Sequence, residues 1–381
     1  MKTPFTWAQR HPRLLLAVLS FGLCAYWFFL AHKPPRPVVY TRNPELKTRL
    51  GREEDKYRAM LPQRQALITK YGPTPAHLVM FPPDQDPWPP YTVWDLFPAI
   101  FNCPHEVDRM GALGDGGKWL CGLSRIQDKP DCVIYSIGMD SSYSLEATLL
   151  RSTRYCQVWI YDSTKGDDAS HYIPRLLRHR AHFAKLTLTS SDHHGPNDDP
   201  KGWTLKSLMA ENGHAHIDFL RLDLEGWEWE AMRGVVSDFT VERATPPQVQ
   251  ADANSTGWTV RERDGVLPFG QLQIELHIWN QRFQDFLEWW ELLEVAGLRP
   301  FHQEINLIYA NYNRRSGVEL AEYSFLNTRG ENAFIRDYTP AAPPTPDGAH
   351  PERPQIADPP AAPAEPPIVE DVRKERREIG S

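Results

Sequence analysis

The chain has 381 residues, a formal net charge of −7 and 41% apolar residues, enough for one large domain or two small ones with a sizeable core. The slight acidic excess argues against a dedicated nucleic-acid binder, because such proteins usually carry a basic face. Five cysteines in this length exclude a small disulfide scaffold. Proline is frequent, with 35 residues, but only eight lie between residues 105 and 339, so the folded domain is expected there.

An uncharged apolar run occupies residues 14–31, after a short N-terminal tail at 1–13. As a helix it would rise about 27 Å, just enough to cross the hydrocarbon core of a membrane. The alternative is a cleaved signal peptide. The apolar region of a signal peptide is shorter and ends in small residues, whereas this run ends in the aromatic residues Tyr26, Trp27, Phe28 and Phe29. The run therefore predicts a single-pass signal anchor. Its position near the N-terminus favours a lumenal domain in the endoplasmic reticulum or Golgi.

The segments that flank the expected domain at 105–337 differ from it in composition. Residues 32–104 are rich in proline and predict a stem or linker, interrupted by one polar helix at 45–70. Residues 338–381 are rich in proline and alanine with few large apolar side chains, which predicts a disordered tail.

Between residues 130 and 327, short apolar runs alternate with amphipathic stretches. The runs predict strands at 132–138, 156–162, 183–189, 217–224, 271–278, 305–311 and 321–327. Helices are expected at 145–154, near 172–180, at 204–212, from Trp227 onward and at 281–296, the last closed by Gly297. This alternation predicts an α/β fold, doubly wound around a mostly parallel sheet, with the last two strands as an antiparallel edge hairpin.

Ligands of such sheets bind beyond the carboxyl ends of the strands, where the strand order reverses. The first strand ends at Gly138, where backbone can approach a ligand closely or simply turn. The second ends at Asp162, whose carboxylate can bind a ribose diol or cap the following turn. The chain has no G-x-G-x-x-G and no G-x-x-x-x-G-K-[ST] motif, so a ligand with a ribose and no phosphate fits better than a nucleotide held by a glycine-rich loop.

Two further strands end in groups that can carry chemistry. The strand at 217–224 carries Asp223 and leads into Glu225, and the strand at 271–278 carries Glu275 and His277. Together they can bind substrate, act as acid or base, or hold a cation. The plainer interpretation is that the carboxylates are solvated and cap the helix that starts at Trp227.

Other metal and cysteine patterns are weak. His193 and His194 lie near Asp192, but a flexible polar loop explains them more simply, and the cysteines lack C-x-x-C spacing. No metal is therefore predicted. Cys103 and Cys121 can pair in an oxidising lumen, which the sequence alone does not decide.

Seven sequence pieces together resemble the class I S-adenosylmethionine-dependent methyltransferases, and more closely the membrane-anchored methyltransferase-like proteins and the FkbM-type domain. The pieces are RMG at 109–111, DGGKWLC at 115–121, YSIG at 135–138, YD at 161–162, DFLRLDLEGWE at 218–228, QIELH at 273–277 and EYSFLN at 322–327. The resemblance implies a seven-stranded, Rossmann-like sheet with S-adenosylmethionine over its first two strands, and an unidentified small-molecule or protein acceptor.

The resemblance also implies roles for single residues. Gly138 would lie against the amino-acid part of the cofactor, Asp162 would hold its ribose, and Asp192 is a candidate for the adenine end. Asp223 and Glu225 would face the transferred methyl group and the acceptor. The candidate site residues are cofactor-binding Ser136, Gly138, Asp162 and Asp192, and catalytic Asp223, Glu225, Glu275 and His277.

Two alternatives remain open. A lumenal, metal-dependent glycosyltransferase has the same order of anchor, stem and domain, and Asp223-Leu224-Glu225 is similar to an acidic metal-binding triplet. A non-catalytic binding module that retains the fold is favoured by the first loop, which holds one glycine where the family usually has two or three.

Overall fold

The computed structural model describes residues 20–23, 26, 43–72, 90–138, 142–165, 167–243, 263–279, 281–312 and 318–337. The expected anchor at 14–31 lies mostly outside these ranges, and the expected tail at 338–381 lies wholly outside them. In the part of the chain that is described, no helix combines the length and the apolar run needed to span a bilayer.

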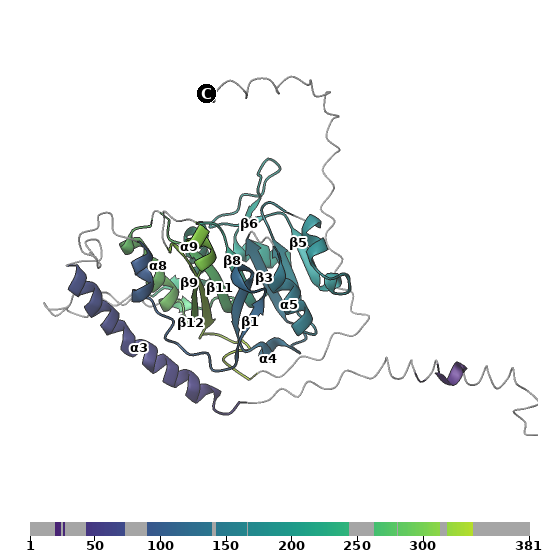
Figure 1. Ribbon diagram of the computed structural model, residues 1–381, viewed down its shortest axis with the longest axis horizontal. Helices are drawn as coiled ribbons and strands as arrows, with labels where there is room; N and C mark the ends of the chain where they lie inside the picture. The colour runs from purple at the N-terminus through teal and green to yellow at the C-terminus, as the bar shows by residue number, and fades with distance from the viewer. Residues whose placement is uncertain are drawn as a thin grey trace, which may run out of the picture. The chain divides into compact units, whose positions relative to one another are not determined.

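A seven-stranded sheet forms the centre of the fold (Figure 1). From one edge to the other its strands are β12 (Leu298–Ile305), β13 (Leu320–Asn327), β11 (Phe269–His277), β8 (Ile217–Asp223), β3 (Val133–Gly138), β4 (Gln157–Tyr161) and β5 (Ala181–Ala184). All neighbouring pairs are parallel except those of β13, which is antiparallel to both β11 and β12. The chain moves outward from β3 to β5 and then returns to β8 on the other side of β3, so the strand order reverses at β3 and β8. The doubly wound sheet and the antiparallel edge hairpin are confirmed.

Alternation along the strands divides the core into two layers. In β3, Tyr135 and Ile137 pack on one face and Ile134 on the other. The first face is covered by α6 (Leu205–Glu211), α7 (Glu228–Phe239) and α8 (Phe283–Val295). The second is covered by α5 (Ser144–Ser152) and by the hairpin of β1 (Val107–Gly111) and β2 (Gly117–Cys121), joined by a 3-10 turn at Gly114–Gly116.

Shorter elements complete the described chain. They are α4 (Leu123–Ile126), α9 (Leu307–Tyr312), the 3-10 helices η2 (Pro90–Leu96), η4 (Asp167–Tyr172) and η5 (Arg175–Arg180), and the strand pairs β6 (Thr187–Leu188) with β7 (Gly202–Trp203) and β9 (Thr240–Glu242) with β10 (Arg263–Gly265).

Three predicted elements differ from the structure. The helix expected near 172–180 is 3-10 rather than α, and Pro174 lies directly before it without a backbone donor. The strand expected at 183–189 divides, with Ala181–Ala184 in the large sheet and Thr187–Leu188 paired with β7. The strand expected at 305–311 is wrong, because the strand ends at Ile305 and the side chain of Asn306 accepts a hydrogen bond from the Tyr309 backbone, starting α9.

The polar helix expected in the stem is present as α3 (Leu46–Tyr71), but it packs against the domain. Tyr57 and Ile68 are buried in the core. Arg64 donates two hydrogen bonds, of 2.9 and 2.7 Å, to the carboxylate of Glu294 in α8, and Tyr57 donates to the same carboxylate. The folded unit therefore includes a segment that its composition assigned to the linker.

Two disulfides lie near the start of the domain. Cys103 pairs with Cys121, the pairing that the sequence left undecided. Cys132 pairs with Cys156, each just before one of the adjacent parallel strands β3 and β4. This second bond was not anticipated.

Candidate functional site

Strand β11 is buried along its whole length, yet only one of its faces is apolar. Leu272, Ile274 and Leu276 pack in the core under α7 and α8. The alternate residues, on the opposite face, are Gln271, Gln273, Glu275 and His277, and all four are buried. Burying polar side chains costs free energy unless they are hydrogen-bonded, so this polar face is a candidate functional site.

Asp223 ends β8 beside this polar face. Its Oδ2 accepts a hydrogen bond of 2.7 Å from Arg221 two residues earlier in the same strand. Its Oδ1 is buried and accepts no hydrogen bond from any residue that the structure describes. Burial, with a contribution from the nearby Glu275, raises the pKa of Asp223 to about 7, even though Arg221 opposes the shift.

Glu275 and His277 bring two further donor groups to Asp223. One ligand atom from each of the three side chains lies within 4.8 Å of the other two. Asn306 fixes Glu275, because the side-chain amide of Asn306 donates a 2.8 Å hydrogen bond to Oε1 of Glu275. Although the sequence predicted no metal, the structure gathers a set of side chains of the kind that binds one.

Glu228, which the sequence did not assign to the site, fixes the imidazole of His277. The carboxylate of Glu228 is fully buried, and its Oε1 accepts from the His277 backbone at 2.6 Å and lies 3.1 Å from its Nδ1. Because a carboxylate only accepts, Nδ1 carries a proton. Burial alone would lower the pKa of His277, but the hydrogen bond and charge of Glu228 raise it to about 9.

Glu225 is the site carboxylate that reaches solvent. Its side chain is 48% exposed, and Oε2 lies 3.9 Å from Nε2 of His277. The backbone of Glu225 has a φ of 52°, which is rare for a residue with a side chain, and Gly226 follows with 96°. This tight turn after β8 leaves the Glu225 carboxylate half-exposed beside the buried His277, and α7 begins at Glu228.

A second ion pair lies beside the cluster. Lys118 of β2 pairs with Glu322 of β13, and Gln273 donates to the same carboxylate. Burial, together with the charge of Glu275, raises the pKa of Glu322 to about 8. For Asp223 and Glu322 alike, the cost of burial outweighs the opposing charge of the paired cation, and the charge of Glu275 adds to the shift.

Asp162 lies at the same edge of the sheet, after β4, and has a different environment. Its Oδ1 accepts from the backbones of Thr164 and Lys165 at 2.7 and 2.9 Å and from the Thr164 hydroxyl at 2.6 Å. Its Oδ2 accepts a 2.6 Å hydrogen bond from Tyr143. Burial alone would raise the pKa of Asp162, but these hydrogen bonds outweigh it and lower the pKa.

Gly138 joins the two regions. It ends β3 between β4 and β8 and lies opposite Asp223 in the parallel register. Its φ is 130°, and a Cβ at this position would lie 1.9 Å from the backbone oxygen of Asp223. Close backbone packing alone therefore requires glycine here.

Two of the predicted cofactor-binding residues make their hydrogen bonds away from the carboxyl edge of the sheet. Ser136 is buried and donates to Glu146 of α5. Asp192 accepts a 2.7 Å hydrogen bond from the Thr204 backbone and another from the Ser207 hydroxyl, at the start of α6. The structure thus brings together Gly138, Asp223, Glu225, Glu275 and His277, with Asp162 on the next strand, whereas Ser136 and Asp192 use their polar groups elsewhere.

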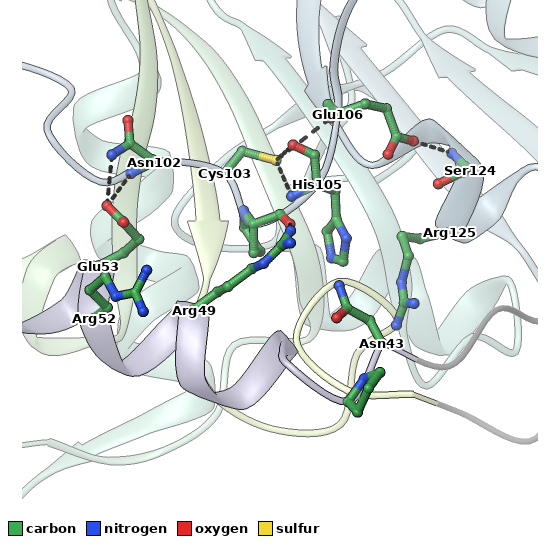
Figure 2. A pocket seen from close by; sticks show the side chains of 12 residues that line it. Asn43, Arg49, Arg52, Glu53, Asn102, Cys103, His105, Glu106, Ser124 and Arg125 are labelled. Atoms are coloured by element: carbon green, nitrogen blue, oxygen red, sulfur yellow. Dashed lines mark hydrogen bonds between the residues drawn. The ribbon is translucent and has the colours of Figure 1, made fainter.

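A separate cavity of about 640 Å³ lies between the start of α3 and the segment before β1 (Figure 2). Arg49 and Glu53 from α3 and His105 and Arg125 from the domain contribute to its lining. None of the predicted site residues lines it.

Comparison with known proteins gives one family match. Residues 83–257 match a family model described as a methyltransferase domain. Over these residues, just under half of its length, the chain is similar to methyltransferase domains. The matched segment includes β3, β4 and β8, so it covers Gly138, Asp162 and Asp223. The predicted resemblance to methyltransferases is confirmed, and it argues against the glycosyltransferase alternative.

The chain has remote likenesses among solved structures. One is the fibrillarin pre-rRNA processing protein of Methanococcus jannaschii, with 8% identity, a TM-score of 0.30, and coverage of 53% of this chain and 67% of the other. Another is the methyltransferase FkbM from Methylobacillus flagellatus KT, with 12% identity, a TM-score of 0.29, and coverage of 51% and 44%. At these values neither structure bears on the function. No curated protein matches the chain.

Proposed function

We propose that this protein transfers a methyl group from S-adenosylmethionine to an acceptor held at the ends of β8 and β11. The family match supports the reaction type. The observation that carries the proposal is the buried carboxylate of Asp162, at the carboxyl end of the strand next to β3. There the strand order reverses, where ligands of such sheets bind.

The groups at this edge fit the ribose of the cofactor. Oδ2 of Asp162 accepts one hydrogen bond, from Tyr143, and an ionised carboxylate oxygen can accept a second. The lowered pKa keeps Asp162 ionised at neutral pH, as an acceptor for a ribose hydroxyl must be. Asp162 would therefore bind the ribose while its Oδ1 continues to hold the turn at Thr164.

S-Adenosylmethionine, when bound, supplies a methyl group on a sulfonium, so attack by an acceptor oxygen or nitrogen forms the new bond to carbon while the C–S electron pair stays on sulfur. The chain's own task is to position the acceptor and remove its proton. Glu225 is placed for the second task, because its half-exposed carboxylate lies beside the buried His277. The buried part of the proposed acceptor site is lined by Asp223, Glu275 and His277.

Calorimetric titration with S-adenosylmethionine and S-adenosylhomocysteine tests the proposal. We expect both to bind the full chain and Asp162→Ala to weaken them at least about tenfold, because a hydrogen bond to a charged group contributes about 1.5–3 kcal/mol. Asp264→Ala is the matched control, since it removes an exposed carboxylate paired only with Arg243 in the described structure. No binding to folded wild-type chain, or equal binding by Asp162→Ala, would contradict the proposal.

We also propose that residues 14–31 anchor the protein with its domain in the lumen. The two disulfides support this location, because such bonds form and persist in oxidising compartments. Asn254 starts an N-x-S/T glycosylation sequence outside the described residues. In a eukaryotic secretory system, we expect the chain to fractionate with membranes and to lose a glycan in the Asn254→Gln variant; an unglycosylated wild-type domain would argue against lumenal placement.

A further inference from the structure

The proposed acceptor site contains a group of side chains that methyl transfer by itself does not require. Asp223, Glu275 and His277 come from the ends of two neighbouring strands, and their exposed fractions are 8%, 4% and 2%. Arg221, Asn306 and Glu228 each pair with one of the three, yet Oδ1 of Asp223 stays buried without a partner in the described chain. Burial penalises charge that is not fully compensated.

The spacing of the three groups matches the coordination shell of one ion. Their ligand atoms all lie within 4.8 Å of one another. Two ligands on opposite sides of a metal are separated by twice a bond length, about 4–5 Å for bonds of about 2.0–2.5 Å. One ion can therefore contact all three residues without a large movement of the strands.

Two independent observations show that donor atoms are available. Oδ1 of Asp223 is buried and receives no hydrogen bond within the described chain, although Oδ2 is paired with Arg221. Glu228 lies against Nδ1 of His277, which keeps a proton on that nitrogen, so Nε2 becomes the ligand atom when an ion displaces its proton. A carboxylate behind a histidine in this way is the usual support for a metal ligand.

The charge around the group also favours a cation. Among the described residues of this polar face and its rim, the carboxylates are Asp223, Glu225, Glu228, Glu275 and Glu322. Arg221 and Lys118 are the permanent cations that face them. When all five carboxylates are ionised, they outnumber Arg221, Lys118 and a protonated His277 by two charges, which one divalent ion would balance.

We propose that Asp223, Glu275 and His277 bind one divalent transition-metal ion. Imidazole favours metals such as Zn²⁺, and carboxylates favour metals such as Mn²⁺, so a mixed set suits these two better than Ca²⁺. Glu225, at the open side and 3.9 Å from Nε2 of His277, lies where a further ligand would enter. The inference goes beyond methyl transfer, since the ion can be detected whether or not any acceptor is methylated.

Electron paramagnetic resonance of Mn²⁺ tests the site directly. The full chain is stripped with a chelator and titrated with MnCl₂, and the signal of free Mn²⁺ is followed. We expect one ion per chain, displaced by Zn²⁺ and not by Ca²⁺ at equal concentration, and a rise in Tm on binding. Glu275→Gln, which keeps the shape and removes one ligand charge, weakens binding at least about tenfold, and Glu228→Gln weakens it about 10–100-fold through His277.

The control for these variants is Glu304→Gln, which removes a carboxylate of β12 that contacts Arg109 and Trp119 instead of the cluster. It is expected to bind Mn²⁺ as wild type does. Circular dichroism of each stripped variant establishes that it is folded. Absence of binding to folded wild type at millimolar Mn²⁺, or an unchanged affinity in folded Glu275→Gln, overturns the proposal. Loss of S-adenosylmethionine binding with intact Mn²⁺ binding would instead count against the methyl-transfer proposal alone.

Discussion

Asp162 and Asp223 are both buried aspartates at the carboxyl edge of the same sheet, one on each side of β3, yet their environments are opposite. Asp162 receives four hydrogen bonds, and its pKa is lowered. Asp223 has one paired oxygen and one without a partner among the described residues, and its pKa is raised to about 7. Burial acts on both carboxylates in the same direction, so the neighbours decide the sign of the shift.

The comparison distinguishes two kinds of buried carboxylate. Asp162 stabilises the turn that follows it, whereas Asp223 is placed to bind a ligand. Donors to Asp162 come from Thr164, Lys165 and Tyr143, so the native turn itself satisfies its charge. The carboxylate of Asp223 in β8 lies near that of Glu275 in the neighbouring strand β11, and the two negative charges repel each other. Losing Asp162 should therefore cost stability, whereas neutralising Asp223 should cost little.

Gly138→Ala is expected to damage both regions at once. The new Cβ would lie 1.9 Å from the Asp223 backbone oxygen at a φ of 130°. Strain and overpacking together predict a loss of about 3–5 kcal/mol in the free energy of unfolding. Urea denaturation measures it, with Gly213→Ala as control, because Gly213 also has a positive φ of 71° but no atom within 4 Å of the added Cβ. Equal losses in the two variants would show that the close approach to Asp223 is unimportant.

Asp162→Ala is expected to lower the free energy of unfolding by about 2–4 kcal/mol, because it removes the acceptor of several charge-assisted hydrogen bonds. Tyr143→Phe, which removes one neutral donor and leaves the carboxylate, is expected to cost about 1 kcal/mol. Both are measured by urea denaturation at neutral pH. If the two variants are equally stable, the turn at Thr164 does not depend on Asp162.

The contribution of Asp162 also depends on pH in a defined direction. Its folded-state pKa is lowered, so its stabilising effect is present above the unfolded pKa of about 3.9 and is lost as the pH falls through the folded value. The stability difference between wild type and Asp162→Ala should therefore be constant from pH 7 to 5 and shrink below about pH 4. A difference that stays constant in acid would contradict the assignment.

Asp223→Asn is expected to have the smallest effect, within about 1 kcal/mol of wild type in metal-free protein. The amide oxygen can still accept from Arg221, and the substitution removes a charge that Glu275 repels. Denaturation of chelator-treated protein at pH 7.5 tests this. A loss as large as that of Asp162→Ala would mean that the Asp223 charge is already balanced in the folded chain.

Much of this arrangement was predictable because it follows from local periodicity. Apolar alternation placed β3, β4, β8 and β11 close to their observed positions. The fold class then placed Gly138, Asp162 and Asp223 at one edge. Glu275 and His277 were predicted from their place at the end of the strand QLQIELH, whose alternate residues on one face are all polar and buried in the structure.

Contacts between distant segments were not predictable in the same way. Glu228 meets His277 across 49 residues, and Arg64 meets Glu294 across 230. Neither pairing leaves a local pattern, so the support behind His277 and the packing of α3 on α8 were missed. The sequence grouped Asp223, Glu275 and His277 and left holding a cation as one of several roles, but their close spacing depends on the register that sets β11 beside β8.

Hydrogen–deuterium exchange of the full chain with S-adenosylhomocysteine would test most directly whether the β3–β4 side binds the cofactor. The backbone amides of Thr164 and Lys165, which donate to Asp162, are the reporters. We predict slower exchange in peptides covering residues 133–138 and 157–165 and no change around the separate cavity at Arg49 and His105. Unchanged exchange at 157–165, or protection confined to that cavity, would contradict it.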